Sequence, residues 1–81
     1  MNTDEVHEIV LEVFQAIFPN LSGDESLTLT REDYPRWDSM AHVSLISALE
    51  GEFDIAISLE TAMNIQSFDQ CLNVVTSLVN A

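Results

Sequence analysis

Apolar residues recur at helical spacing in the N-terminal part of the chain. Thr3 is a suitable N-cap, and Asp4 and Glu5 after it carry the charge that the positive end of a helix dipole favours. Pro19 ends the helix near Phe18. The pattern therefore predicts an amphipathic helix whose apolar side consists of Val6, Ile9, Val10, Val13, Phe14 and Ile17.

Residues 19–37 show no sustained period and are rich in Pro, Gly, Asn, Asp and Ser, which are turn formers. A loop of this length in a small domain usually has a function or a packing role. We expect a long first loop that is held on the core by Leu21, Leu27 and Leu29.

Three further helices follow the loop. Asp38 caps the second, Ser58 caps a short third, and Ser67 opens the fourth, where Gln70 completes a capping box. The apolar positions are Met40, Val43, Leu45, Ile46, Leu49 and Phe53 in the second helix, Leu59, Ala62 and Met63 in the third, and Phe68, Cys71, Leu72, Val75, Leu78 and Val79 in the fourth.

These elements predict an all-α fold, a four-helix bundle with three longer helices, one short third helix and a long first loop. At 81 residues the chain has room for one domain, residues 1–81, in which the apolar stripes close a single core. Small domains bury little surface, so a deep catalytic cleft with several buried polar groups would be hard to support.

The charge is strongly one-sided. Fourteen acidic residues stand against two basic ones, Arg31 and Arg36, and the formal net charge is -12. A phosphate backbone and an anionic membrane surface would both be repelled, so we expect neither nucleic-acid nor membrane binding. The hydrophobic fraction of 47% indicates a folded domain rather than an acidic tail. The charge either steers the chain to basic partners or only keeps it soluble.

Cysteine and metal-binding patterns exclude several kinds of site. The single cysteine, Cys71, forms no intramolecular disulfide, and its apolar neighbours indicate a buried, inert thiol. There is neither a calcium-loop motif nor a cysteine–histidine cluster for zinc. The acidic N-terminus is unlike a signal peptide, and no apolar run approaches the roughly 20 residues of a membrane span. We therefore expect a cytoplasmic protein without a metal, and we also expect a monomer.

The stretch Trp37-Asp38-Ser39-Met40 carries the most chemical information. With Asp38 as the cap, Ser39 occupies the first helical position and its hydroxyl stands at the positive end of the helix. A phosphodiester built there would be favoured by free backbone N–H groups and the dipole. Such caps are common, so on local grounds alone an ordinary helix start is the better explanation of the stretch.

The wider context of Ser39 resembles the second helix of acyl carrier proteins, which shows Asp-Ser-Leu, apolar positions and then Leu-Glu-x-x-Phe. The similarity extends from Thr3 to about Asn80 and includes the long loop, the short third helix and the acidic balance. The residues that carry it are Asp38, Ser39, Met40, Val43, Leu45, Ile46, Ala48, Leu49, Glu50, Glu52, Phe53 and Ile55.

The resemblance implies an acyl-carrier-like bundle without enzymatic activity of its own. Ser39 would accept 4′-phosphopantetheine from a phosphopantetheinyl transferase, and the arm would hold acyl or aminoacyl groups as thioesters. Loading, condensing or modifying enzymes would be further partners. The face between the second and third helices opens in this family to shelter the cargo. We expect it to be lined here by Val43, Ile46, Leu59, Ala62 and Met63.

The chain departs from fatty-acid carriers along the second helix. Met40 replaces the usual leucine, and Ala41 and Ser44 stand where those carriers usually have acids. No acid remains from Ser39 to Leu49, so the chain resembles carriers of specialised biosynthesis more closely. We expect His42 to be exposed. The expected partner contact consists of Trp37, Ala41, His42 and Ser44.

Two other functions remain open at this stage. The first is an unmodified helical interaction module of the same fold. The second is a small hydrolase, because Ser39 and His42 are three residues apart and share a helix face. Neither a residue to orient the histidine nor an oxyanion hole is evident, which disfavours the hydrolase.

Overall fold

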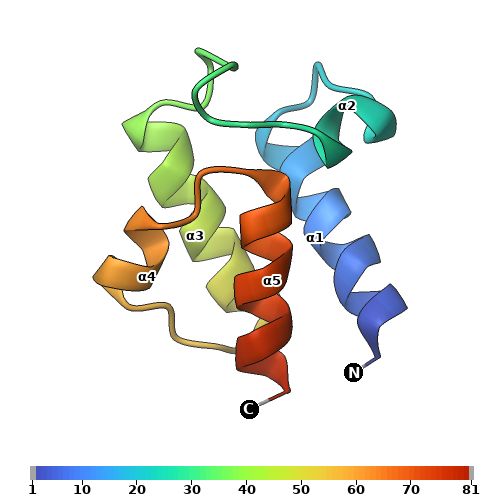
Figure 1. Cartoon of the computed structure of the whole chain (residues 1–81), viewed down its shortest axis with the longest axis vertical. Helices are drawn as coiled ribbons and strands as arrows, with labels where there is room; N and C mark the ends of the chain where they lie inside the picture. Colours follow the sequence, from blue (N-terminus) through green and yellow to red (C-terminus); the bar gives the residue numbers. More distant parts are fainter. Residues whose placement is uncertain (1, 81) are drawn as a thin grey trace.

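A computed structural model describes residues 2–80 and places five helices in them (Figure 1). The predicted all-α class is confirmed, and the described part contains no strand beyond an isolated antiparallel bridge between Thr30 and Ser67. The helices are α1 (Thr3–Ile17), α2 (Gly23–Leu27), α3 (Ser39–Phe53), α4 (Leu59–Met63) and α5 (Phe68–Val79).

The count of four helices is wrong, because α2 lies inside the segment predicted as a long loop. Its start is a capping box: the Glu25 N–H donates to Ser22 Oγ at 3.1 Å, and the Ser22 N–H donates to Glu25 Oε1 at 3.0 Å. The Ser-x-x-Glu spacing that makes this box is visible in the sequence. Leu29 is buried and Leu21 and Leu27 pack against the core, as expected.

The helix caps follow the sequence closely. Asp38, Ser58 and Ser67 are the N-caps of α3, α4 and α5. At α1 the cap is Asn2 rather than Thr3, because the Asn2 side chain accepts the Glu5 N–H at 2.9 Å. The fourth predicted helix lacks its reciprocal capping box, since the side chain of Gln70 accepts the N–H of Gln66 instead of that of Ser67.

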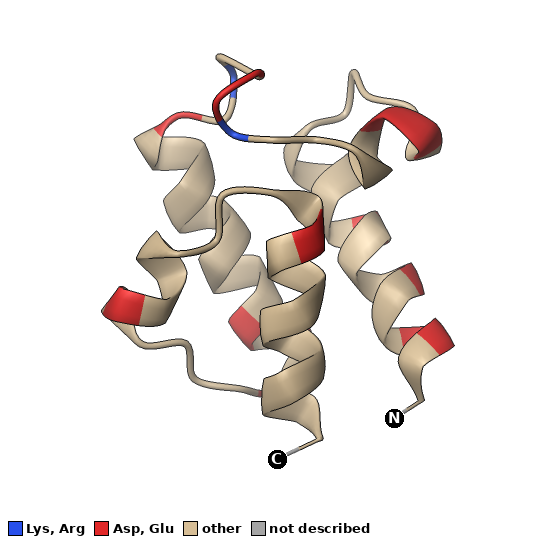
Figure 2. Cartoon of the chain, viewed as in Figure 1, with Lys and Arg blue, Asp and Glu red and all other residues tan. Residues whose placement is uncertain are grey.

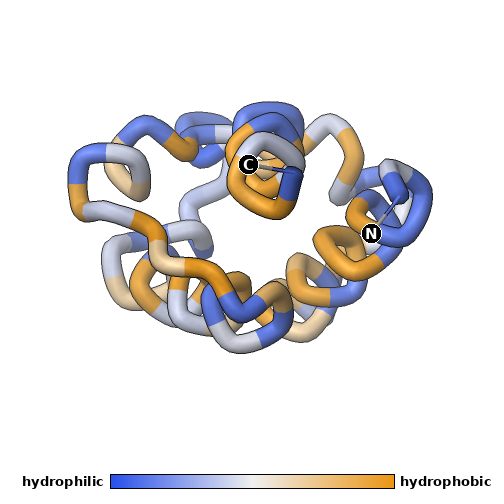
Figure 3. Tube along the Cα trace, turned by 90° about the horizontal axis from the view of Figure 1, so that it is seen from below, coloured by the Kyte–Doolittle hydropathy of each residue, from blue (hydrophilic) through white to orange (hydrophobic). Residues whose placement is uncertain are grey.

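One core lies between the three longer helices. α1 packs against both α3 and α5, and the view from below shows the helix turns arranged around a common centre (Figure 3). The largest fully buried side chains are aromatic: Phe14 meets Phe68 edge-on with ring centroids 5.0 Å apart and Trp37 edge-on at 5.5 Å. Burial of such rings dominates the energy of a small core. The loop before α3 is thereby fixed to α1.

None of the helices in residues 2–80 is long and apolar enough to cross a membrane.

Candidate functional site

Ser39 is exposed at the first position of α3. Asp38 precedes it in an extended conformation, and its carboxylate accepts the Ala41 N–H at 2.9 Å. The capped end presents the Ser39 hydroxyl beside backbone N–H groups of the first turn, where the helix dipole favours negative charge. The site is therefore suited to carry an anionic substituent.

The segment that leads to Ser39 is held by several hydrogen bonds. The Trp37 N–H donates to the Tyr34 carbonyl at 2.9 Å, and Arg31 Nε–H donates to the Trp37 carbonyl at 3.3 Å. The Arg31 N–H donates to the Gln66 carbonyl at 2.8 Å, which ties the loop to the chain just before α5. With the Trp37 indole buried, the start of α3 has a defined position.

His42 is buried, so the expectation of an exposed histidine is wrong. Only 9% of its surface remains accessible. The Trp37 Nε1–H donates to His42 Nδ1 at 3.0 Å, and His42 Nε2 lies 2.8 Å from the Ala62 carbonyl oxygen. Because Nδ1 accepts, the proton of the neutral ring is on Nε2, which donates to Ala62.

The Ser–His pair of a hydrolase is not formed. Both ring nitrogens of His42 have partners in the core, Trp37 and Ala62, so neither is free to take a proton from Ser39. A shared helix face was the only argument for this pair, and the burial of the ring removes it.

The expected partner contact is only partly at the surface. The side chains of Trp37 and His42 are buried and offer no contact, which corrects that prediction, whereas Ser44 is exposed and Ala41 is partly exposed. Neither Trp37 Nε1 nor His42 Nδ1 is left unpaired in the core, because the Trp37 Nε1–H donates to His42 Nδ1. Asp38 lies just before α3 and Glu50 and Glu52 lie in its last turns, so the helix carries no acid from Ser39 to Leu49 (Figure 2).

An apolar hollow of about 300 Å³ lies between α3 and α4. All five side chains predicted for the cargo site line it. Sequence reasoning did not anticipate His42 in its wall, because the histidine was expected to face solvent. The lining residues are Val43, Ile46, Leu59, Ala62 and Met63 together with His42, Ser47 and Ile57.

Large apolar side chains around this hollow are unusually exposed. Met40 is 81% exposed, Leu59 79%, Val43 66% and Met63 65%. Single exposed apolar residues are normal, but a group on adjoining helices beside a hollow indicates a binding surface. Met40 lies one turn before Val43 on α3, so this apolar rim reaches the turn that begins with Ser39.

Neither a protein-family model nor a curated protein matches this chain. Its function must therefore be argued from its own residues. Among residues 2–80, no group of three or more histidine, cysteine, aspartate or glutamate side chains is placed to hold a metal ion.

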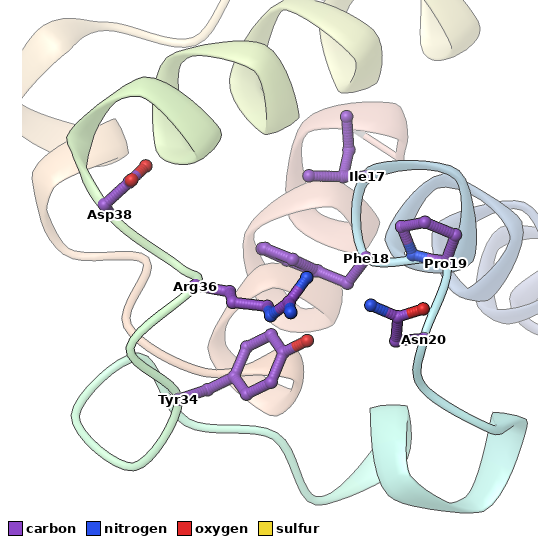
Figure 4. A pocket seen from close by; sticks show the side chains of 7 residues that line it. All are labelled: Ile17, Phe18, Pro19, Asn20, Tyr34, Arg36 and Asp38. Atoms are coloured by element: carbon purple, nitrogen blue, oxygen red, sulfur yellow. The ribbon is translucent and has the colours of Figure 1, made fainter.

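A second hollow, of about 280 Å³, lies on the other side of the loop before α3. Figure 4 shows the Arg36 side chain extending from the loop toward the end of α1. The two arginines of the chain both belong to this loop, the blue positions of Figure 2. The lining residues are Ile17, Phe18, Pro19, Asn20, Tyr34, Arg36 and Asp38.

Cys71 has the chemistry of a core residue. Its side chain is fully buried in α5, and burial raises the pKa of the thiol from 9.0 to about 12. The thiolate, which is the nucleophile, is therefore disfavoured near neutral pH. This thiol is not a candidate for nucleophilic catalysis.

Proposed function

We propose that the chain is an acyl carrier protein that bears 4′-phosphopantetheine on Ser39. The observation that carries this proposal is the placement of an exposed serine at the capped start of α3, next to an apolar hollow between α3 and α4. A tethered carrier needs both an accessible hydroxyl and a nearby place for an apolar cargo.

The residues at Ser39 fit the phosphate of such an arm. The Asp38 side chain accepts the Ala41 N–H, and the N–H groups of Ser39 and Met40 before it have no partner within the helix. Those groups and the dipole favour the phosphodiester. When bound, the arm would supply a thiol that holds acyl or aminoacyl groups as thioesters. Tethering raises the effective concentration of the cargo at each partner enzyme.

The shape of the hollow fits an aliphatic cargo. Its wall is formed mainly by aliphatic side chains and Met63, and an acyl chain that enters it loses contact with water. Met63 and Leu59 stand at its exposed edge, where flexible or mobile side chains admit ligands of different length. A thioester shielded in this way is also protected from hydrolysis.

The surface fits dedicated partners rather than fatty-acid synthases. The first half of α3 presents Met40, Val43 and Ser44 to solvent and carries no acid. Asp38 lies just before the helix, and Glu50 and Glu52 lie in its last turns. An apolar centre flanked by negative charge matches an apolar patch flanked by basic residues. A phosphopantetheinyl transferase and the enzymes that load and modify the cargo are the proposed partners, in the cytoplasm.

The test is an intact-mass measurement. The chain is co-expressed with a broad-specificity phosphopantetheinyl transferase, together with Ser39→Ala and, as the matched control, Ser77→Ala on an exposed serine of α5. We expect one arm on the parent chain and on Ser77→Ala, and none on Ser39→Ala. An unmodified parent chain would instead favour the unmodified interaction module, because the exposed apolar side chains could also bind a protein partner. An arm on Ser39→Ala would refute the assignment of Ser39.

A further inference from the structure

α4 is the most weakly packed helix of residues 2–80. It has five residues, of which only Ala62 is buried, and it is absent from the helix pairs that pack extensively. Ile57 before it and Ile65 after it are buried and anchor its two ends. The helix itself is therefore free to shift more easily than α1, α3 or α5, because few buried apolar contacts hold it.

His42 supplies the side-chain hydrogen bond that joins α3 to α4. Its Nε2–H donates to the Ala62 carbonyl at 2.8 Å, across 20 residues of sequence. Ala62 lies in the last turn of α4, and its carbonyl also accepts the Ile65 N–H at 3.2 Å just beyond the helix. The imidazole is thus a second donor to a carbonyl at the end of α4, and it reaches that carbonyl from the wall of the apolar hollow.

The opposite edge of the same ring is bonded to the segment that leads to Ser39. Nδ1 accepts the Trp37 Nε1–H at 3.0 Å, and the two rings stack with centroids 6.0 Å apart and an interplanar angle of 28°. Trp37 is two residues before Ser39, and its indole is buried against Phe14. A movement of the imidazole must therefore change the hydrogen bond of the indole.

From these contacts we propose that His42 is a positioning residue that couples the α3–α4 hollow to the start of α3. An apolar chain that enters the hollow displaces α4, pulls on the Ala62 bond and tilts the imidazole, which changes the Trp37 bond beside Ser39. The arm's attachment point thereby responds to whether the hollow is filled. The inference deepens the proposed carrier function and rests on it for its biological meaning.

The coupling is measured without a transferase. In Ser39→Cys protein, octyl methanethiosulfonate forms a disulfide with the introduced thiol by attack of its thiolate on the sulfenyl sulfur, with methanesulfinate leaving. The methyl reagent gives the matched control without a chain. Cys71 is buried with a pKa of about 12, and intact mass checks that one label is present. The readouts are the methyl resonances of Val43 and Met63 for the hollow, and the indole N–H resonance of Trp37, the only tryptophan.

We expect the octyl chain, but not the methyl group, to shift the methyl signals of Val43 and Met63. The octyl chain should also move the indole N–H signal of Trp37 upfield and speed the exchange of this proton with deuterium. His42→Asn keeps a polar group near the Nδ1 position and His42→Gln one near the Nε2 position, so each retains one of the two bonds. In both variants the methyl signals should still shift while the indole signal no longer follows.

Three results would each overturn the coupling. In the first, the octyl chain leaves the methyl signals of Val43 and Met63 unchanged, and in the second the indole signal stays in place although those methyl signals shift. The third is an indole signal that still responds to the octyl chain in both His42 variants. Should the variants fail to fold, the first two of these results still test the coupling, because they need only the octyl and methyl labels on Ser39→Cys protein that retains His42. The coupling experiment uses no transferase, so the two tests are independent. Absence of the phosphopantetheine arm in the mass measurement refutes only the carrier function, and an indole N–H signal that does not respond to the octyl chain refutes only the coupling.

Discussion

The carboxylate of Glu50 accepts the backbone N–H of Ile57 at 2.9 Å, although Glu50 belongs to the last turns of α3 and Ile57 lies beyond its end. The Glu50 carbonyl also accepts the Ile55 N–H at 3.3 Å. A negative side chain is not favoured near the C-terminus of a helix. The linker to α4 explains why Glu50 stands here: its carboxylate accepts a backbone N–H of this linker at Ile57, whose side chain is buried.

Removing this carboxylate should loosen the linker. We expect Glu50→Ala to lower the free energy of unfolding by about 1 kcal/mol, the usual net value of one hydrogen bond, and to speed amide exchange at Ile57. Glu50→Gln retains an acceptor and should lose less. Urea unfolding and hydrogen exchange measure both effects. Glu52→Ala, an exposed acid on the same helix, is the control, and unchanged exchange at Ile57 in Glu50→Ala would contradict the role.

Cys71 should resist alkylation in the folded protein. Burial raises the pKa of its thiol to about 12, so almost no thiolate exists at pH 8, and the sulfur is also shielded from the reagent. We expect iodoacetamide to label Cys71 promptly in urea and very slowly without it. In Ser39→Cys protein the introduced thiol is exposed and should react at once, which gives the internal comparison. Equal rates at both thiols would show that α5 opens readily.

Because its thiol is buried, Cys71 should also lower the free energy of unfolding at alkaline pH. Its folded pKa lies above the ordinary value of 9.0, so its contribution is complete below pH 9 and declines as pH rises toward 12, where the unfolded chain gains by losing the proton. The decline between these values should be smaller in Cys71→Ala, as urea unfolding at pH 8 and pH 10 would measure.

Glu25 should titrate below its ordinary range because of the α2 capping box. The Ser22 backbone N–H and then the Ser22 side chain lower the pKa of this carboxyl, which is fully exposed. The ionised form therefore contributes stability above pH 4.5, and that contribution is lost as pH falls through the lowered value. In Ser22→Ala the pKa should rise part of the way back, since the backbone donor remains. A carbon-detected NMR titration measures the pKa of Glu25, and an unchanged pKa in Ser22→Ala would contradict the contribution of the Ser22 hydroxyl.

Met40 should matter for partners and not for stability. With 81% of its surface exposed, Met40→Ser should change the free energy of unfolding by less than about 0.5 kcal/mol. If the apolar rim contacts the transferase, the same change should slow addition of the arm. Ser77→Ala, at an exposed position of α5, is the control for both measurements. Equal modification rates for the parent chain and Met40→Ser would remove Met40 from the partner contact.

Acids introduced into the first half of α3 should speed acyl transfer from this chain to a fatty-acid ketosynthase. Ala41→Asp with Ser44→Glu would add one charge at a partly exposed position and one at an exposed position, and each exposed ion pair is worth about 0.2–1 kcal/mol. We expect faster transfer from the loaded double variant, and a gain that salt reduces. The kinetics of the parent chain supply the baseline. A parent chain that already works as well as a fatty-acid carrier would refute the specialised role.

Local chemistry determined much of this protein directly. The helix starts at Asp38, Ser58 and Ser67 follow from side chains that accept hydrogen bonds from their own first turns, and such bonds need no distant partner. The exposure of Ser39 follows from its place after the cap. Even α2, which the prediction missed, has its local signal in the Ser22 and Glu25 spacing.

The orientation of α3 was decided only by the tertiary structure. Apolar residues occur on more than one side of this helix, so the sequence pattern does not fix which side is buried, and Met40 and Val43 are left in solvent while His42 is inside. The burial of His42 depends on Trp37 and on the Ala62 carbonyl, which lies 20 residues away. A polar ring is buried without penalty only when both nitrogens are satisfied, and those partners meet only after α3, α4 and the loop have packed together.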